Sequence, residues 1–164
     1  MSRLFGLGRP ARQDAGQSLV EFALILPIFL LVITGLFDVA RAVWQENTLA
    51  FAAREGTRYA IVHGSASSPI AWPGSATATT CSNGTPTPSC QGVFDAVTSA
   101  SVGVANVGVT VTWPDTSGGT TCYDRNCRVI VDTTAQFVPM PSQYLLGGAF
   151  QITLRGGSQL YIQR

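Results

Sequence analysis

One uninterrupted apolar stretch constrains this chain more than any other feature of its sequence. Residues 19–37 hold 19 positions, of which only Glu21 is charged. A helix of that length is about 28 Å long, which matches the hydrocarbon thickness of a bilayer. Pro27 and Gly35 are tolerated in membrane helices, although Pro27 is expected to bend this one. The stretch predicts a membrane segment, and its single carboxylate needs a specific explanation because an ionised group is costly in hydrocarbon.

The overall composition limits what the rest of the chain can be. The 164 residues leave room for one ordinary domain beside the membrane segment, and 46% of them are hydrophobic but only 12% charged, with a net charge of +1. This composition argues against a nucleic-acid surface, which requires clustered basic residues. Every basic residue is an arginine, which excludes both a Schiff-base lysine and a phosphate-loop lysine.

The four cysteines form two pairs in the sequence, Cys81 with Cys90 and Cys122 with Cys127. Neither spacing fits a zinc knuckle, and the single histidine, His63, is far from both pairs, so no metal site is predicted. Four cysteines allow three connectivities, and we favour the two local pairs because each closes a short loop at low entropic cost. Disulfides would place this region in an oxidising compartment outside the cytoplasm.

The helical pattern does not stop at the end of the apolar stretch. Residues 38–62 contain no proline and a single glycine, Gly56, and their alanines and valines recur near helical spacing. Gly64 follows His63 as a natural C-cap, and His63 is expected to contact the last carbonyls of the helix. We therefore predict one helix over about residues 18–62, transmembrane in its first half and amphipathic in its second.

Alternating apolar residues in the last third of the chain predict a small antiparallel sheet. The segments with this alternation are 107–113, 129–137 and 150–154. The third is expected to break at Gly156-Gly157, with residues 160–162 continuing it or forming a fourth strand. A loop is predicted over residues 64–92 and a short helix over 93–100. The amphipathic half of the long helix is the obvious cover for the apolar face of three or four strands, so the predicted fold class is α+β.

The predicted organisation has three parts. Residues 1–16 form a short basic leader, residues 17–37 a transmembrane segment, and residues 38–164 an extracytoplasmic helix with a disulfide-stapled β domain. Arginines lie on both sides of the apolar stretch, so the cysteines decide the orientation better. The predicted topology is single-pass with the C-terminal domain outside the cytoplasm.

Signals for catalysis are scarce. The motifs G-x-S-x-G, G-x-G-x-x-G and H-E-x-x-H are absent from the sequence. Asp115, Asp124 and Asp132 flank predicted turns and strand ends, but their spacing matches no calcium loop. We predict no catalytic residue, no metal and no cofactor, and therefore a protein that is not an enzyme.

The residues around Glu21 carry a family resemblance. Gly16 is followed by four residues, then Glu21 and the aromatic Phe22, and this spacing resembles the processing site of Flp-type type IV pilins. The whole run from 16 to 27 resembles the TadE-like pseudopilins of tight-adherence systems, as does the Ala- and Arg-rich continuation at 52–58. The resemblance is specific over the long helix and only general over the predicted strands.

The resemblance implies a pilin-like fold and a minor role in assembling a tight-adherence pilus at the bacterial inner membrane. It implies cleavage after Gly16 by a membrane prepilin peptidase, which leaves Gln17 as the new N-terminus. Glu21, followed by Phe22 at the start of the apolar run, would then neutralise the amine of a neighbouring subunit. The implied partners are the membrane, the prepilin peptidase, other pilin-like subunits and pilus assembly proteins.

Two other interpretations remain open from the sequence. Ala40-Arg41-Ala42 is a small-x-small site after the apolar run, where a signal peptidase would cut after Ala42 and release a soluble β-rich domain. The apolar run is longer than a usual signal core, which argues against this cut. The other interpretation is an uncleaved, membrane-anchored extracytoplasmic enzyme or binding protein, and the scarcity of catalytic motifs argues against the enzyme.

Overall fold

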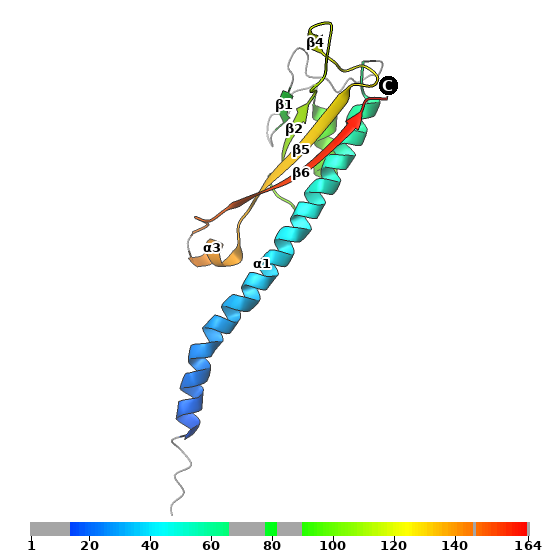
Figure 1. Cartoon of the computed structure of the whole chain (residues 1–164). Coiled ribbons are helices and arrows are strands. Elements are labelled where there is room, and N and C mark those ends of the chain that lie inside the picture. The colour runs from blue at the N-terminus through cyan, green and yellow to red at the C-terminus, as the bar shows by residue number, and fades with distance from the viewer. Residues whose placement is uncertain (1–13, 66–77, 82–89, 146, 164) are drawn as a thin grey trace, which may run out of the picture.

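A computed structural model describes residues 14–65, 78–81, 90–145 and 147–163. Figure 1 shows one long helix with the strands beside its upper part and α3 lower down, below the sheet. In chain order the elements are α1 (Asp14–Val62), β1 (Ala78–Cys81), α2 (Gln91–Ala100), β2 (Gly108–Thr112), β3 (Thr116–Ser117), β4 (Thr120–Thr121), β5 (Arg128–Phe137), α3 (Met140–Leu145) and β6 (Ile152–Tyr161).

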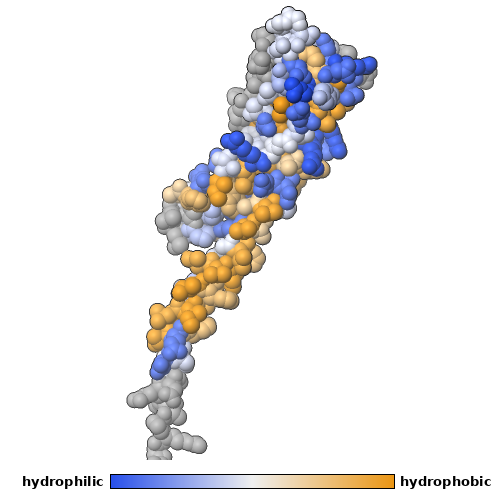
Figure 2. Space-filling model, in the orientation of Figure 1, coloured by the Kyte–Doolittle hydropathy of each residue, from blue (hydrophilic) through white to orange (hydrophobic). Residues whose placement is uncertain are grey.

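Helix α1 has two halves in different environments. Its 49 residues make it about 73 Å long. None of its apolar, membrane-length window is buried by the domain, and Figure 2 shows hydrophobic residues gathered along this lower part. In the upper half the side chains of Leu49, Ala52 and Ala53 are fully buried. The predicted long helix, with its second half covering a sheet, is confirmed.

The sheet beside α1 has four antiparallel strands in the order β1-β2-β5-β6. Burial alternates along β2 and β5, and Val109, Val111, Val129 and Val131 are fully buried. Val111 pairs with Val131 across the β2–β5 ladder. Period-two alternation in the sequence thus gives one apolar face, and the predicted α+β class with an antiparallel sheet is confirmed.

Helix α2 and a tryptophan complete the core. Val93, Phe94 and Val97 are the buried residues of α2, and they lie in the same cluster as Leu49 of α1. Trp113, which follows β2, is 2% exposed in that cluster. Burying a large apolar side chain stabilises the folded state by about 1.5–3 kcal/mol. Because the buried side chains come from the upper half of α1, from α2 and from the sheet, the core requires all three.

The closest approach between α1 and the sheet occurs at Gly156 in β6. A Cβ at this position would lie 2.5 Å from the backbone nitrogen of Ala50 and 2.5 Å from the carbonyl carbon of Leu49. Beside it, the Oγ1 of Thr133 lies 3.1 Å from the carbonyl oxygen of Leu49 and 3.0 Å from that of Gly156. The predicted break at Gly156-Gly157 is wrong, because β6 runs straight through both glycines. Glycine is used here for close backbone approach and not to end a strand.

Four further elements were not predicted. The predicted loop at 64–92 contains β1, which pairs with β2 from Ala78↔Thr112 to Cys81↔Val109. The β3–β4 hairpin lies between β2 and β5, and α3 begins directly after Pro139 and contains Pro141. These elements are two to six residues long, too short to show a repeated apolar pattern in the sequence. Their structure depends on contacts with other parts of the chain.

We expect the substitution Gly156→Ala to destabilise the domain by about 1–3 kcal/mol, because the added methyl group meets helix backbone that cannot move aside. The measurement is the midpoint of unfolding of the detergent-solubilised protein, followed by circular dichroism. Gly157→Ala is the matched control, because its Cβ would meet only the Oδ1 of Asp132, the end of a flexible side chain. Equal effects of the two substitutions would contradict the close-approach explanation.

Candidate functional site

The residues predicted for processing and assembly all lie at the start of α1. Gly16, Gln17, Glu21 and Phe22 belong to its first turns, and Phe22 is 63% exposed. The Nε2 of Gln17 donates a hydrogen bond to the Oε1 of Glu21 over 3.1 Å. Residues four apart lie one above the other on a helix, so this contact is local and involves no part of the domain.

Gly16 has open space around it. A side chain at this position would meet nothing within 4 Å, and the same holds for Gly35 further along α1. Packing within this chain therefore does not require glycine at either position. A requirement for glycine at position 16 would have to come from a molecule that approaches this backbone.

Glu21 carries a charge without a compensating cation in the described part of the chain. The three ion pairs found there involve Asp38, Glu55 and Asp115, and Gln17 supplies a neutral donor to Glu21. The neighbours of Glu21 along the helix surface, Leu24 and Ile25, are 69% and 63% exposed. The carboxylate thus stands at the edge of an apolar surface that the domain leaves uncovered.

The exposed apolar surface of α1 continues above the predicted membrane segment. We call this continuation the outer stripe, and its residues are Val39, Val43 and Phe51, which are 51–63% exposed. Their spacing places them on one side of the helix. Asp38, Leu49 and Ala52, which belong to the sheet-facing side, are buried. The outer stripe therefore faces away from the sheet.

Polar contacts join α1 to the chain between β5 and α3 just after the apolar stretch ends. The Oδ2 of Asp38 accepts a hydrogen bond from the backbone N–H of Met140 over 2.8 Å. The Nη2 of Arg41 donates to the carbonyl oxygen of Val138 over 2.6 Å, and its guanidinium lies 4.7 Å from the ring centroid of Phe137. We call this set of contacts the junction.

The junction leaves two polar atoms without a hydrogen bond among the described residues. They are the Oδ1 of Asp38 and the Nε of Arg41, both buried. Asp38 Oδ1 and Arg41 Nη2 are 3.6 Å apart, close enough for an ion pair but too far for a hydrogen bond. Asp38 is only 6% exposed, so its charge is compensated by Arg41 and one backbone amide.

An apolar groove of about 420 Å³ separates α3 from the lower half of α1. Its lining residues are Pro27, Leu30, Leu31 and Thr34 of α1 with Met140, Pro141 and Tyr144 of α3. The Oγ1 of Thr34 donates to the carbonyl oxygen of Leu31 over 3.0 Å. That hydroxyl donor is therefore engaged within the helix, and the surface of the groove is almost entirely hydrocarbon.

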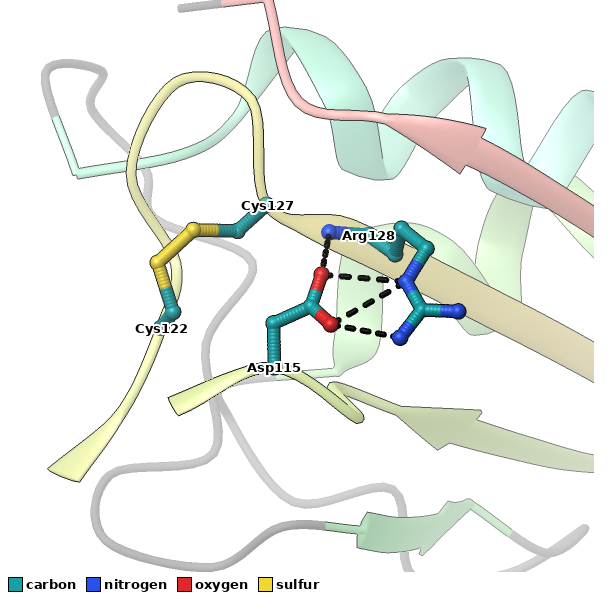
Figure 3. A network of polar contacts seen from close by, with 4 residues as sticks. All are labelled: Asp115, Cys122, Cys127 and Arg128. Carbon is teal, nitrogen blue, oxygen red and sulfur yellow. Dashed lines mark hydrogen bonds and ion pairs between the residues drawn. A yellow bond between two sulfur atoms is a disulfide. The ribbon is translucent and has the colours of Figure 1, made fainter. Parts of the chain in front are cut away.

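The opposite end of the sheet is held by a disulfide and an ion pair (Figure 3). Cys122 is bonded to Cys127, with 5.9 Å between their Cα atoms. Asp115 accepts bonds from the backbone N–H of Arg128 over 2.7 Å and from its Nη2 over 2.6 Å. The bonds from Arg128 hold the pKa of the Asp115 carboxyl below its ordinary value, and the carboxylate raises the pKa of Arg128.

The other predicted disulfide falls partly outside the described residues. Cys90 is disulfide-bonded, but the side chain of its predicted partner, Cys81, is not among those described. Of the two favoured pairs, the structure therefore shows Cys122–Cys127 directly. That pair closes the loop between β4 and β5 beside the ion pair of Asp115.

The structure places His63 at the C-terminal end of α1. Its Nδ1 lies 2.8 Å from the carbonyl oxygen of Tyr59, to which it donates a hydrogen bond, and the two rings stack with centroids 3.9 Å apart. This is the contact expected of a residue at the end of a helix. Among the described residues no group of three His, Cys, Asp or Glu side chains is arranged to hold a metal ion.

Sequence reasoning missed the junction. Asp38 received no role from the sequence and Arg41 only a place in the Ala40-Arg41-Ala42 site, because their partners Val138 and Met140 are about 100 residues away. One signal was available: Asp38 follows the membrane segment directly and lies on the same side of the helix as the later apolar residues. An acid on the core-facing side of a helix requires a partner.

A comparison with protein families identifies the N-terminal part of the chain. The sequence model of the family described as TadE-like protein matches residues 16–58, a range that begins at Gly16 and covers the apolar stretch and most of the upper half of α1. The resemblance to this family is therefore confirmed. The matched family is one of structural proteins associated with the tight-adherence pilus. Neither the curated proteins nor the solved structures contain a match to this chain.

We expect Asp38→Ala to release α3 from α1, because the amide of Met140 loses its hydrogen-bond acceptor and the guanidinium of Arg41 loses its ion-pair partner. An unsatisfied buried group costs about 1–3 kcal/mol, which corresponds to roughly 5- to 150-fold faster hydrogen exchange at the amides of α3. Exchange measured by mass spectrometry on the detergent-solubilised protein tests this. Glu46→Ala, which removes an exposed acid of the same helix, is the control, and unchanged exchange in the Asp38 variant would refute the role of the junction.

Proposed function

We propose that this chain, TadE-like over residues 16–58, is a membrane-anchored minor pilin or pseudopilin. It takes part in assembling a tight-adherence, Flp-type pilus or secretion apparatus, and a prepilin peptidase processes it after Gly16. It crosses the bacterial inner membrane once, with its C-terminal domain outside the cytoplasm. Its role is structural, in contact with other pilin-like subunits and pilus assembly proteins.

The observation that carries the proposal is the uncovered lower half of α1 together with the acid at its start. A helix that exposes a membrane-length apolar surface needs a lipid or protein environment. Glu21 lies near the beginning of that surface, with Gln17 as its hydrogen-bond donor. An ionised carboxylate that enters an apolar environment requires a cationic partner, and in the described part of the chain no cation pairs with it, so a partner from another molecule fits this position.

Processing after Gly16 would supply such a cation. The cut leaves the amine of Gln17 four residues before Glu21, a rise of about 6 Å along the helix. In an assembly of parallel subunits the amine of one chain can then approach the carboxylate of its neighbour. The open space around Gly16 supports access by a protease to this backbone.

The outer stripe supports an assembly role over a monomeric one. Its apolar side chains lie above the predicted membrane segment and face away from the sheet, where neither lipid nor this domain covers them. A second helix packed along α1 would bury this surface and the lower apolar segment at once. Helices of other pilin-like subunits are partners of the right chemistry.

The disulfide supports the proposed orientation. Cys122–Cys127 lies between β4 and the start of β5, and Figure 1 shows these elements at the end of the domain farthest from the lower half of α1. Such bonds persist in oxidising compartments and are rare in the cytoplasm. A domain outside the cytoplasm with the basic leader inside satisfies both the disulfide and the arginines before the apolar stretch.

We expect the mature protein to begin at Gln17, and Gly16→Val to block this processing, because a β-branched side chain would obstruct the close approach of a protease to the backbone. Intact-mass spectrometry of the protein purified from its native host gives the N-terminal residue. Gly35→Val is the matched control, since Gly35 has the same open surroundings but lies away from the cut. A mature chain beginning at Val43 would show signal-peptidase release instead, and one beginning at Met1 or Ser2 an unprocessed anchor.

We expect Glu21→Gln to lower incorporation into the assembled apparatus by roughly tenfold or more, because losing one member of a buried ion pair costs about 3–5 kcal/mol. The measurement is the amount of this chain recovered with its pilin-like partners after mild crosslinking, relative to its amount in the membrane. Glu46→Gln, an exposed acid of the same helix, is the control. Normal recovery of the Glu21 variant would show that the carboxylate does not pair in assembly.

A further inference from the structure

Helix α3 lies beside a part of α1 that belongs to the predicted membrane segment. The groove between them is lined on the α1 side by residues from Pro27 to Thr34, whereas the apolar stretch continues to Phe37. At 1.5 Å per residue, the groove therefore extends from about 5 Å to about 15 Å below the end of that stretch. A domain element thus reaches down beside helix that the proposed function places in lipid.

The chain around α3 is suited to that position. Residues 133–154 contain no Asp, Glu, Lys, Arg or His. We call residues 138–151, which connect β5 with β6 and include α3, the α3 tip. Within it Tyr144 is 81% exposed, Phe150 56% and Met140 38%. Exposed aromatic side chains on an uncharged segment are typical of the interface between lipid and water.

The groove offers almost no polar group for a ligand to bind. The hydroxyl of Thr34 is bonded within α1, and the amide of Met140 is bonded to Asp38. Polar ligands are oriented by a few well-placed polar groups, and such groups are scarce here. A hydrocarbon chain, which needs contact alone, fits the surface that remains.

We propose that the α3 tip is a membrane contact of the domain: Tyr144 and Phe150 insert into the interface of the leaflet on the domain side, and phospholipid acyl chains fill the groove. This inference rests on the proposed function, because it requires the apolar half of α1 to be in a bilayer. The tip reaches into the leaflet on the domain side and does not cross the bilayer, since the chain has to return to β6 of the domain.

A neighbouring helix is the less suitable occupant of the groove. Helices that pack in membranes approach each other through small residues, but the lining of this groove consists of large apolar and aromatic side chains with one threonine. Flexible acyl chains adapt to such an uneven surface. The outer stripe, on another part of α1, remains available for protein partners.

The test uses photocrosslinking of the full-length protein in a bilayer. Benzoylphenylalanine replaces Tyr144, Tyr161 or Ile25, one at a time, and each protein is reconstituted in vesicles of phosphatidylethanolamine and phosphatidylglycerol with alkyne-tagged acyl chains. Tyr161 is the matched control, because it is an aromatic residue of 55% exposure at the other end of β6, opposite Arg128. Ile25, 63% exposed in the apolar stretch, reports whether α1 itself is in lipid.

We expect lipid adducts at position 144 in a yield comparable to that at 25 and several-fold above that at 161. Adducts at 25 without adducts at 144 would overturn the membrane contact while leaving the anchor intact. Crosslinks from 144 to a second copy of the chain in place of lipid would overturn it in favour of a protein occupant. Absence of lipid adducts at 25 would refute membrane anchoring, and with it both the proposed function and this inference.

Discussion

The structure depends on how closely the backbone of α1 approaches β6. At Gly156 the strand is so close to the helix that a single methyl group would meet the backbone of Leu49 and Ala50. Fully buried Ala52 and Ala53, together with Gly56 against Val97 of α2, keep the neighbouring surface equally small. Small residues on the helix and glycine on the strand therefore satisfy the same constraint, and they let β5 and β6 pack closely against α1.

The close packing at β6 involves only the upper half of α1, so the lower half is not needed for the core of the domain. All of the core residues that α1 contributes, from Leu49 to Ala60, come after the apolar stretch. The domain can bury its core without any residue before Asp38, and it leaves the membrane-length apolar window of the lower half of α1 uncovered. Since the helix is continuous from Asp14 to Val62, the orientation of the lower half is transmitted to the sheet without a flexible linker.

Helices and strands with long periodic patterns could be predicted from the sequence. Elements that depend on contacts between distant residues could not. The helix over residues 18–62 and the strands beginning near 107, 129 and 150 follow from periodicity that extends over five or more residues. Gly156 looked like a strand breaker, because glycine weakens a strand unless something approaches closely, and that approach depends on a helix about 100 residues earlier. Strand β1 and helix α3 are short and have no periodic pattern, so pairing with β2 and bonding to Asp38 determine them.

Most residues of the candidate site could be found from the sequence, but the junction could not. Gly16, Glu21 and Phe22 were found from spacing and resemblance alone, and the structure adds their exposure and the hydrogen bond from Gln17. Spacing could not reveal the junction, because Asp38 and Arg41 have a structural role only through their hydrogen bonds to Met140 and Val138. A motif that acts on other molecules is local in sequence, whereas a contact that positions one part of a chain against another is not.

The two ends of the sheet are tied to α1 by different kinds of interaction, and their positions explain the choice. At the far end, the amide of Gln163 donates to the carbonyl of Ile61 over 3.0 Å, and the amide of Ile162 donates to the carbonyl of Cys127 beside the disulfide. A covalent bond keeps its strength in water, where exposed ion pairs contribute little. At the near end Asp38 and Arg41 are largely withdrawn from water, where charged hydrogen bonds are stronger and a missing partner is costly. The far end is thus closed by a covalent bond, while the end nearer the apolar half of α1 is held by hydrogen bonds and an ion pair.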